Sequence, residues 1–199
     1  MHQYKSGFVS IIGRPNVGKS TLLNSLVGEK IAIMSDKPQT TRNKISAIVT
    51  EEDYQIIFID TPGLHRPKNK LGEYMVKVAE QTFNEVDVLL FVVESSSKVR
   101  QSELEILQQL QDVKTPIILV INKIDLIKKE ELLSVMDEYN KHFSFHSIIP
   151  ISALTHDGVD IIKDEIKKIL PEGPMFFPED MITDQPEKQI ASEIIREKI

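Results

Sequence analysis

The segment that most constrains the fold lies near the N-terminus, where residues 13–20 read GRPNVGKS. This sequence fits the pattern G-x-x-x-x-G-K-[ST]. The apolar run at 8–12 predicts a buried strand before it, and the spacing of 20–27 predicts a helix after it, which Gly28 ends. In such a strand–loop–helix unit, backbone N–H groups and the helix N-terminus surround a phosphate. A chance glycine-rich turn would not have these flanks, so the sequence predicts a phosphate-binding loop.

Three further segments each follow an apolar run that predicts a strand. Ligands of open α/β sheets bind beyond the carboxyl ends of the strands, so we expect all three to converge on the phosphate-binding loop. The segments are Asp60-Thr61-Pro62-Gly63, Asn122-Lys123-Ile124-Asp125 and Ser152-Ala153-Leu154.

The residue types in these segments suit a guanine nucleotide bound with Mg²⁺. Asp60 can hold Mg²⁺ through water, and the Gly63 N–H can reach a γ-phosphate. The Asp125 carboxylate can accept from both N1–H and the amine of guanine, a donor pair that adenine lacks. Small residues at Ser152 and Ala153 let backbone N–H groups approach the guanine carbonyl. Each signal alone is weak, since Pro-Gly is usually a turn and a charged loop is usually solvated. Their positions after a phosphate-binding loop and after strands favour a guanine nucleotide, and Asn122 to Asp125 argue against a P-loop kinase or ATPase.

The remaining pattern predicts an α/β fold of the P-loop NTPase (small G-protein) kind. Strands at 45–50 and 54–59 are joined by three residues, which requires an antiparallel hairpin. We therefore expect a six-stranded, mostly parallel sheet with one antiparallel edge strand and helices on both faces. The other elements expected are a central strand at 86–93, strands at 116–121 and 148–151, and helices at 71–83, from about 102, at 130–142 and at 159–170.

Composition narrows the class of protein. The chain has no cysteine, which excludes disulfides and thiolate metal sites, and its five histidines have no zinc-binding spacing. The net charge of −6 argues against a broad nucleic-acid-binding surface. No apolar run reaches the length of a membrane span.

The chain resembles the Era-type GTPases of the translation-factor-related class over essentially its whole length. The residues that carry the resemblance are 13–20, Pro38-Gln39-Thr40-Thr41-Arg42, Asp60-Thr61-Pro62-Gly63-Leu64-His65, 122–125, 177–180 and 191–198. The resemblance implies a Mg²⁺-dependent switch that binds and hydrolyses GTP in assembly of the small ribosomal subunit. It also implies a cytoplasmic protein, associated peripherally with the inner face of the cell membrane in some members. The alternative is a nucleotide-gated RNA- or ribosome-binding module in which hydrolysis only resets the state.

The resemblance also implies a domain division. We expect a GTPase domain at 1–171, a connector at 172–187 and, at 188–199, the start of a KH-type domain that binds ribosomal RNA. An apolar stripe of isoleucines in 188–199 has no helix cap after it, so we expect the chain to end inside the first helix of that domain. The alternative is a one-domain GTPase with a docked terminal helix. The oligomeric state stays open.

The candidate catalytic residues are Lys19, Thr41, Gly63 and Asn16. Alignment with related proteins indicates Thr41 as the switch threonine and Mg²⁺ ligand, with Thr40 as the alternative. The metal ligands expected are Ser20, Thr41 and Asp60. The residues expected at the nucleotide are Gly13, Arg14, Pro15, Asn16, Val17, Gly18, Lys19, Ser20, Thr21, Asp60, Thr61, Pro62, Gly63, Leu64, Asn122, Lys123, Ile124, Asp125, Ser152, Ala153 and Leu154.

Leu64 departs from Ras-like GTPases, in which a glutamine at this position orients the attacking water. The resemblance implies that Asn16 is a K⁺ ligand, because related GTPases with an asparagine at this position use it to place K⁺ where an arginine finger would lie. The alternative is that Asn16 caps or braces the loop. Arg14 is expected to face solvent, and nothing in the sequence places Arg100 near the site, so neither is interpreted as a finger. Guanosine tetraphosphate is a further candidate ligand, because no motif grips the 3′ position of the ribose.

Overall fold

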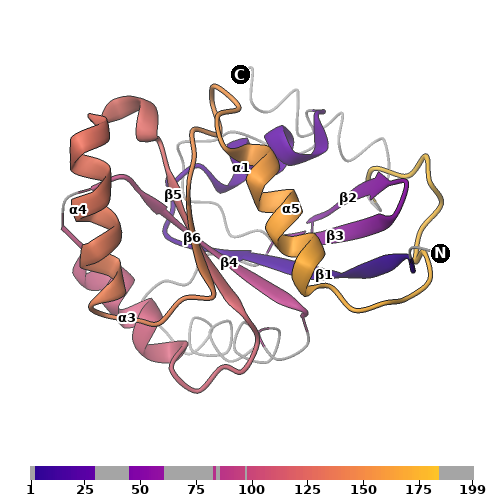
Figure 1. Cartoon of the computed structure of the whole chain (residues 1–199), viewed down its shortest axis with the longest axis horizontal. Coiled ribbons are helices and arrows are strands. Elements are labelled where there is room, and N and C mark those ends of the chain that lie inside the picture. Colours follow the sequence, from indigo (N-terminus) through magenta and orange to yellow (C-terminus); the bar gives the residue numbers. More distant parts are fainter. Residues whose placement is uncertain (1–2, 30–44, 61–82, 84–85, 97, 184–199) are drawn as a thin grey trace, which may run out of the picture.

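A computed structural model describes residues 3–29, 45–60, 83, 86–96 and 98–183 of the chain (Figure 1). Its centre is one six-stranded sheet with the order β2-β3-β1-β4-β5-β6. Only the β2–β3 pair is antiparallel, which confirms the predicted hairpin and edge strand. The strands are β1 (Lys5–Ile12), β2 (Ile45–Glu51), β3 (Tyr54–Asp60), β4 (Val88–Glu94), β5 (Ile117–Asn122) and β6 (Ser147–Pro150).

Four α-helices and a short 3₁₀ helix are described. They are α1 (Lys19–Val27), α3 (Gln101–Gln109), η1 (Ile124–Leu126), α4 (Lys129–Asn140) and α5 (Val159–Ile169). The helix expected at 71–83 lies outside the described residues except for Phe83, which is helical. None of the helices in the described ranges is long and apolar enough to cross a bilayer.

Strand β4 begins two residues later than the apolar run predicts. The Asp87 carboxylate accepts a hydrogen bond of 2.8 Å from the Phe8 N–H, so a side chain occupies the place of a strand carbonyl there. The β1–β4 ladder starts at the next position, where Val9 pairs with Val88.

The sheet has a separate apolar core on each face, as the prediction of helices on both sides requires. On one face, α1 and α5 pack over the sheet through residues such as Leu22 and Ile166. On the other face, α3 and α4 pack through residues such as Ile106 and Tyr139. Phe58 lies in the apolar core on the α1 and α5 face, and Phe83 lies in the core on the α3 and α4 face. Residues 88–93 of β4 are buried on both faces of the sheet, which accounts for the continuous apolar run in the sequence.

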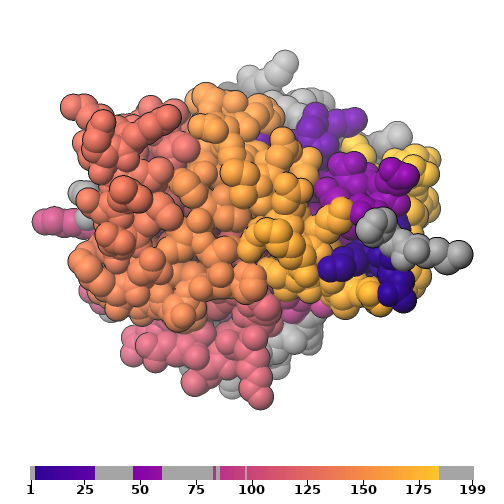
Figure 2. Space-filling model, viewed as in Figure 1, coloured from indigo at the N-terminus to yellow at the C-terminus, as the bar shows by residue number. Residues whose placement is uncertain are grey.

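The segment after α5 returns across the other end of the sheet. Figure 2 shows it, in yellow, beside the indigo N-terminal strand and the purple β2–β3 hairpin. The Ile48 N–H donates to the Ile182 carbonyl at 2.8 Å, and the rings of Phe8 and Phe176 lie 5.4 Å apart. The part of the expected connector that is described, up to residue 183, therefore packs on the sheet.

Gln55 attaches this segment to β3. Its side chain is fully buried, accepts hydrogen bonds from the Phe176 and Phe177 N–H groups at 2.9 and 3.0 Å, and donates to the Phe177 carbonyl at 2.9 Å. It also donates to the Thr50 hydroxyl at 2.9 Å. One buried amide thus satisfies three backbone groups more than 100 residues away in the sequence.

We expect Gln55→Ala to lower the free energy of unfolding by at least about 2 kcal/mol, because it leaves buried backbone groups without partners. Urea unfolding followed by circular dichroism measures this. The matched control is Gln108→Ala on the exposed face of α3, which should change stability by no more than about 0.5 kcal/mol. Equal effects of the two substitutions would contradict the role given to Gln55.

Candidate functional site

The predicted phosphate-binding loop connects β1 to α1 and depends on two glycines. Gly13 has φ 148° and Gly18 has φ 95°, both in the region that favours glycine. A Cβ on Gly13 would overlap the Val92 carbonyl oxygen, and one on Gly18 would overlap the Asn122 amide nitrogen. The two glycines therefore let the loop lie directly against the ends of β4 and β5.

The amino end of α1 is electropositive. Lys19 is its first residue, and its ammonium crosses the loop to donate to the carbonyls of Gly13, at 3.0 Å, and Arg14, at 2.7 Å. The first turn of α1 contains no acidic residue, whereas α3, α4 and α5 each have one or more. The positive helix end is thus left without a charge partner from its own first turn, as a phosphate site requires.

Asn122, at the end of β5, joins three loops. Its side chain is buried, and its Nδ2 donates to the Val17 carbonyl of the phosphate-binding loop at 2.9 Å. Its Oδ1 accepts from the Lys123 N–H at 2.8 Å and from the Ala153 N–H at 3.0 Å. One amide therefore fixes the phosphate-binding loop, the 122–125 loop and the 152–154 loop relative to one another.

The 122–125 loop presents Asp125 to solvent. Lys123 adopts φ 67°, a left-handed conformation, and the short helix η1 follows. The Ser95 hydroxyl donates to the Lys123 carbonyl at 2.7 Å, and the Ile124 N–H donates to the Ile151 carbonyl at 3.1 Å. Asp125 is exposed, so its carboxylate is accessible on a backbone that is held from both sides.

The 152–154 loop lies beside this aspartate loop, as predicted, but its N–H groups differ from the expectation. The Ala153 N–H donates to Asn122 and the Ser152 N–H donates to the Asp157 carbonyl at 2.9 Å. Both groups therefore have partners inside the protein. Their direct contact with a guanine carbonyl stays a prediction.

The prediction that Arg14 faces solvent was wrong. Its side chain is only 15% exposed, because its Nε donates to the buried Glu103 carboxylate of α3 at 2.9 Å. The same carboxylate accepts from the Tyr139 hydroxyl at 3.0 Å and from the Arg100 N–H at 2.8 Å. Burial and the Glu103 charge raise the pKa of Tyr139, so it stays a neutral donor. Arg14 thus anchors the loop to α3 and is not directed outward as a finger.

Glu94 is a residue of this edge that the sequence reasoning missed. Glu94 is the last residue of β4, which lies in the sheet between β1 and β5, the strands that lead into the phosphate-binding loop and the 122–125 loop. Its place directly after a predicted strand at this edge was the sequence feature that could have indicated a role in the site. Its carboxylate forms ion pairs with Lys123, Arg100 and Arg14. Partial burial by itself would raise the pKa of the Glu94 carboxyl, but Lys123, Arg100 and Arg14 together hold that pKa below its usual value.

The residues expected to hold Mg²⁺ are described only in part. Ser20 is the second residue of α1, and the backbone of Asp60 pairs with Ile11 at the strand end beside the phosphate-binding loop. These two positions therefore lie at one edge of the sheet and fit the donor types that Mg²⁺ prefers. Thr40, Thr41, Thr61, Pro62, Gly63 and Leu64 lie outside the described residues.

The sheet order, the phosphate-binding loop and the Asn-Lys-x-Asp loop held together at one edge define the fold as that of a P-loop GTPase. The chain belongs to the family described as 50S ribosome-binding GTPase, whose profile matches residues 8–123.

Comparison with individual proteins gives a closer likeness. The chain is 60% identical over 196 residues to the GTPase Era of Ruminiclostridium cellulolyticum, a match that covers 98% of this chain and 66% of the relative. It is similar to the crystal structure of Era with MgGDPNP and nucleotides 1506–1542 of 16S ribosomal RNA, with TM-score 0.89 and 45% identity over 98% of this chain and 67% of that one. An Era variant from Aquifex aeolicus bound to GDP·AlF₄⁻ gives TM-score 0.87 and 45% identity over 98% of this chain and 66% of that one. The chain thus spans about two thirds of the length of these relatives.

The lowered pKa of Glu94 predicts how its contribution to stability depends on pH. A carboxyl whose pKa is lower in the folded state than its usual 4.5 stabilises the fold fully above that value, and the contribution is lost as pH falls through the lowered pKa. Parent and Glu94→Gln should therefore differ most in urea midpoint near neutral pH, and the difference should shrink as pH falls from neutral to below 4.5. A difference that stays constant over this range would contradict the pairing.

Proposed function

We propose that this chain binds GTP and GDP at the edge formed by residues 13–21, 60–64, 122–125 and 152–154, and hydrolyses GTP. The observation that carries the proposal is the hydrogen bonding of Asn122, which holds the phosphate-binding loop against the loop that presents Asp125. A ligand that fills both parts must carry a phosphate chain and a base with adjacent donors. Guanine nucleotides meet both requirements.

In the proposed reaction, water attacks the γ-phosphate in line and GTP and water become GDP and phosphate. The backbone N–H groups of the phosphate-binding loop orient the phosphates, and the Lys19 ammonium, which lies across that loop, offsets negative charge on the β- and γ-phosphates. Gly63 and Thr41 are proposed to contact the γ-phosphate from the 60–64 loop and the switch segment. Mg²⁺, held by Ser20, Asp60 and Thr41, would supply further neutralisation of phosphate charge.

The biological output is proposed by likeness to Era. An Era structure contains both MgGDPNP and a 16S ribosomal RNA segment, and this supports a switch that acts on the small ribosomal subunit. We propose that the RNA contact is made through the KH-type domain that the resemblance implies, because the net charge of −6 does not favour these residues as an RNA surface. A nucleotide-gated RNA-binding module, in which hydrolysis only resets the state, is the second candidate. A cytoplasmic location with peripheral membrane association belongs to the same proposal.

Calorimetric titration with GTP, GDP, guanosine tetraphosphate and ATP, with and without Mg²⁺, tests the ligand assignment. The guanine nucleotides, including the tetraphosphate, should bind, and ATP should bind at least about 100-fold more weakly, because it lacks the donor pair for Asp125. Asp125→Asn should lose a similar factor for GTP and gain affinity for xanthosine triphosphate. GTP binding as tight in this variant as in the parent would contradict the base assignment, and equal affinity for ATP would contradict the function.

The catalytic role of K⁺ is tested through Asn16. This residue is exposed at φ 65°, and its carbonyl accepts from the Lys123 ammonium at 2.8 Å, so its backbone braces the loop while its side chain is a candidate K⁺ ligand. Single-turnover hydrolysis should be about tenfold faster in potassium than in sodium, well below the roughly 10³–10⁵ supplied by an arginine finger.

Asn16→Ala should remove this potassium effect and leave GDP binding nearly intact. Asn16→Gly is the matched variant that accommodates the positive φ without strain. Equal rates of the parent in the two salts, or a potassium effect that persists in both variants, would eliminate the cation hypothesis.

A further inference from the structure

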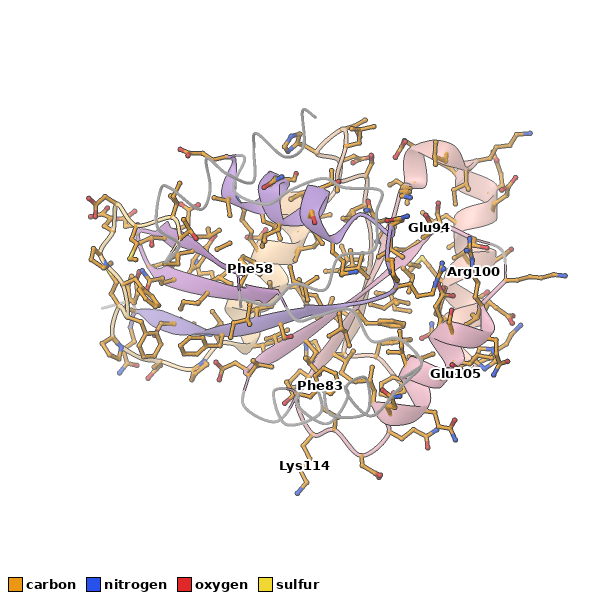
Figure 3. The ribbon with its side chains drawn as sticks, turned by 180° about the vertical axis from the view of Figure 1, so that it is seen from behind. Phe58, Phe83, Glu94, Arg100, Glu105 and Lys114 are labelled. Carbon is orange, nitrogen blue, oxygen red and sulfur yellow. The ribbon has the colours of Figure 1, made fainter. Side chains whose placement is uncertain are left out.

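The carboxylate of Glu94 is the meeting point of three cations from three different segments. Its Oε1 forms an ion pair with the Lys123 ammonium. Its Oε2 lies 3.1 Å from Arg100 Nη2 and 3.5 Å from Arg14 Nη2. Figure 3 shows Glu94 at the end of its strand and Arg100 at the start of α3, at the same edge of the sheet. The Glu94 side chain is 25% exposed, so water screens these pairs only in part.

Two of these cations belong to the loops of the nucleotide site. Lys123 follows Asn122, and its ammonium also donates to the Asn16 carbonyl at 2.8 Å. Arg14 lies in the phosphate-binding loop, where its carbonyl accepts from Lys19 at 2.7 Å. Glu94 therefore contacts both loops from a rigid strand that lies between them in the sheet.

The three cations do not depend on Glu94 equally. Arg14 keeps a second carboxylate, Glu103, at 2.9 Å. For Lys123 and Arg100, Glu94 is the one carboxylate partner within the part of the chain that the structure describes. Removing its charge would leave two like charges close together with no anion between them, and the resulting repulsion would push Lys123 away from the Asn16 carbonyl.

We propose that Glu94 is a positioning residue that slows guanine-nucleotide release by holding Lys123 on the Asn16 carbonyl, and so fixes the spacing between the base loop and the phosphate-binding loop. The inference rests on the proposed function, since it specifies how the same site retains its ligand. Glu94 acts through Lys123, so it should not affect the choice of base, which is assigned to Asp125.

The test is the dissociation rate of a fluorescent GDP analogue chased with excess GDP. Glu94→Gln keeps the shape and removes the charge, and we expect release about tenfold faster, which corresponds to the loss of one charge-assisted contact. The preference for GTP over xanthosine triphosphate, which is assigned to Asp125, should match the parent. The control is Glu138→Gln, which removes the charge of a carboxylate on α4 that pairs with Lys141, just after that helix. This variant should release GDP at the parent rate.

A second substitution separates positioning from a general loss of structure. In the Glu94→Gln background, Arg100→Gln removes the cation that repels Lys123, so it should return the release rate at least partway toward that of the parent. A protein weakened only in stability would not be rescued by removing a second polar side chain. If Glu94→Gln does not fold, Glu94→Asp, whose carboxylate is one methylene shorter, should show an intermediate acceleration.

Parent-like release by Glu94→Gln, or by Glu94→Asp where only that variant folds, would overturn the inference. So would the absence of any rescue by Arg100→Gln. A parent that binds no guanine nucleotide would overturn the proposed function and this inference with it. Tight binding by the parent together with unchanged release in the variants would overturn the inference alone.

Discussion

The side chain of Asn122 is the interaction on which the site depends. Three segments separated by up to about 140 residues in the sequence must be held within a few ångströms of one another, and loops carry little intrinsic order. A single buried amide does this with one donated and two accepted hydrogen bonds. Because the amide ends β5, an interior strand buried on both faces, its own position is fixed by the two apolar cores.

This arrangement also explains the glycine at position 18. The loop can lie on the Asn122 amide only where no Cβ intervenes, so the phosphate-binding motif and the base-binding motif depend on each other sterically. Two glutamates add further attachments for these loops. Glu103 of α3 holds Arg14, and Glu94 of β4 holds Lys123. The result is a site whose loops are positioned by strand ends and one helix, with Asp125 left accessible.

The sequence predicted the features whose chemistry is local. The strand order at the hairpin, the helix ending at Gly28 and the four motifs follow from spacing within short segments, and the structure confirms the sheet and brings the described motifs together. Arg14 was misplaced because its partner Glu103 is 89 residues away, and nothing in the loop itself indicates burial. Glu94 was missed because a lone glutamate after a strand is usually solvated, and only the folded sheet places three cations around it. The contacts of Gln55 with residues 176 and 177 depend on the path of the chain after α5, which no local pattern determines.

Asn122 joins the separate loops into one site, and the GDP affinity of Asn122→Ala tests this role most directly. Its matched control is Asn140→Ala, at the exposed end of α4. We predict that Asn122→Ala still unfolds cooperatively but binds GDP at least about 100-fold more weakly than the parent, while Asn140→Ala binds as the parent does. GDP binding by folded Asn122→Ala that is as tight as in the parent would contradict the account.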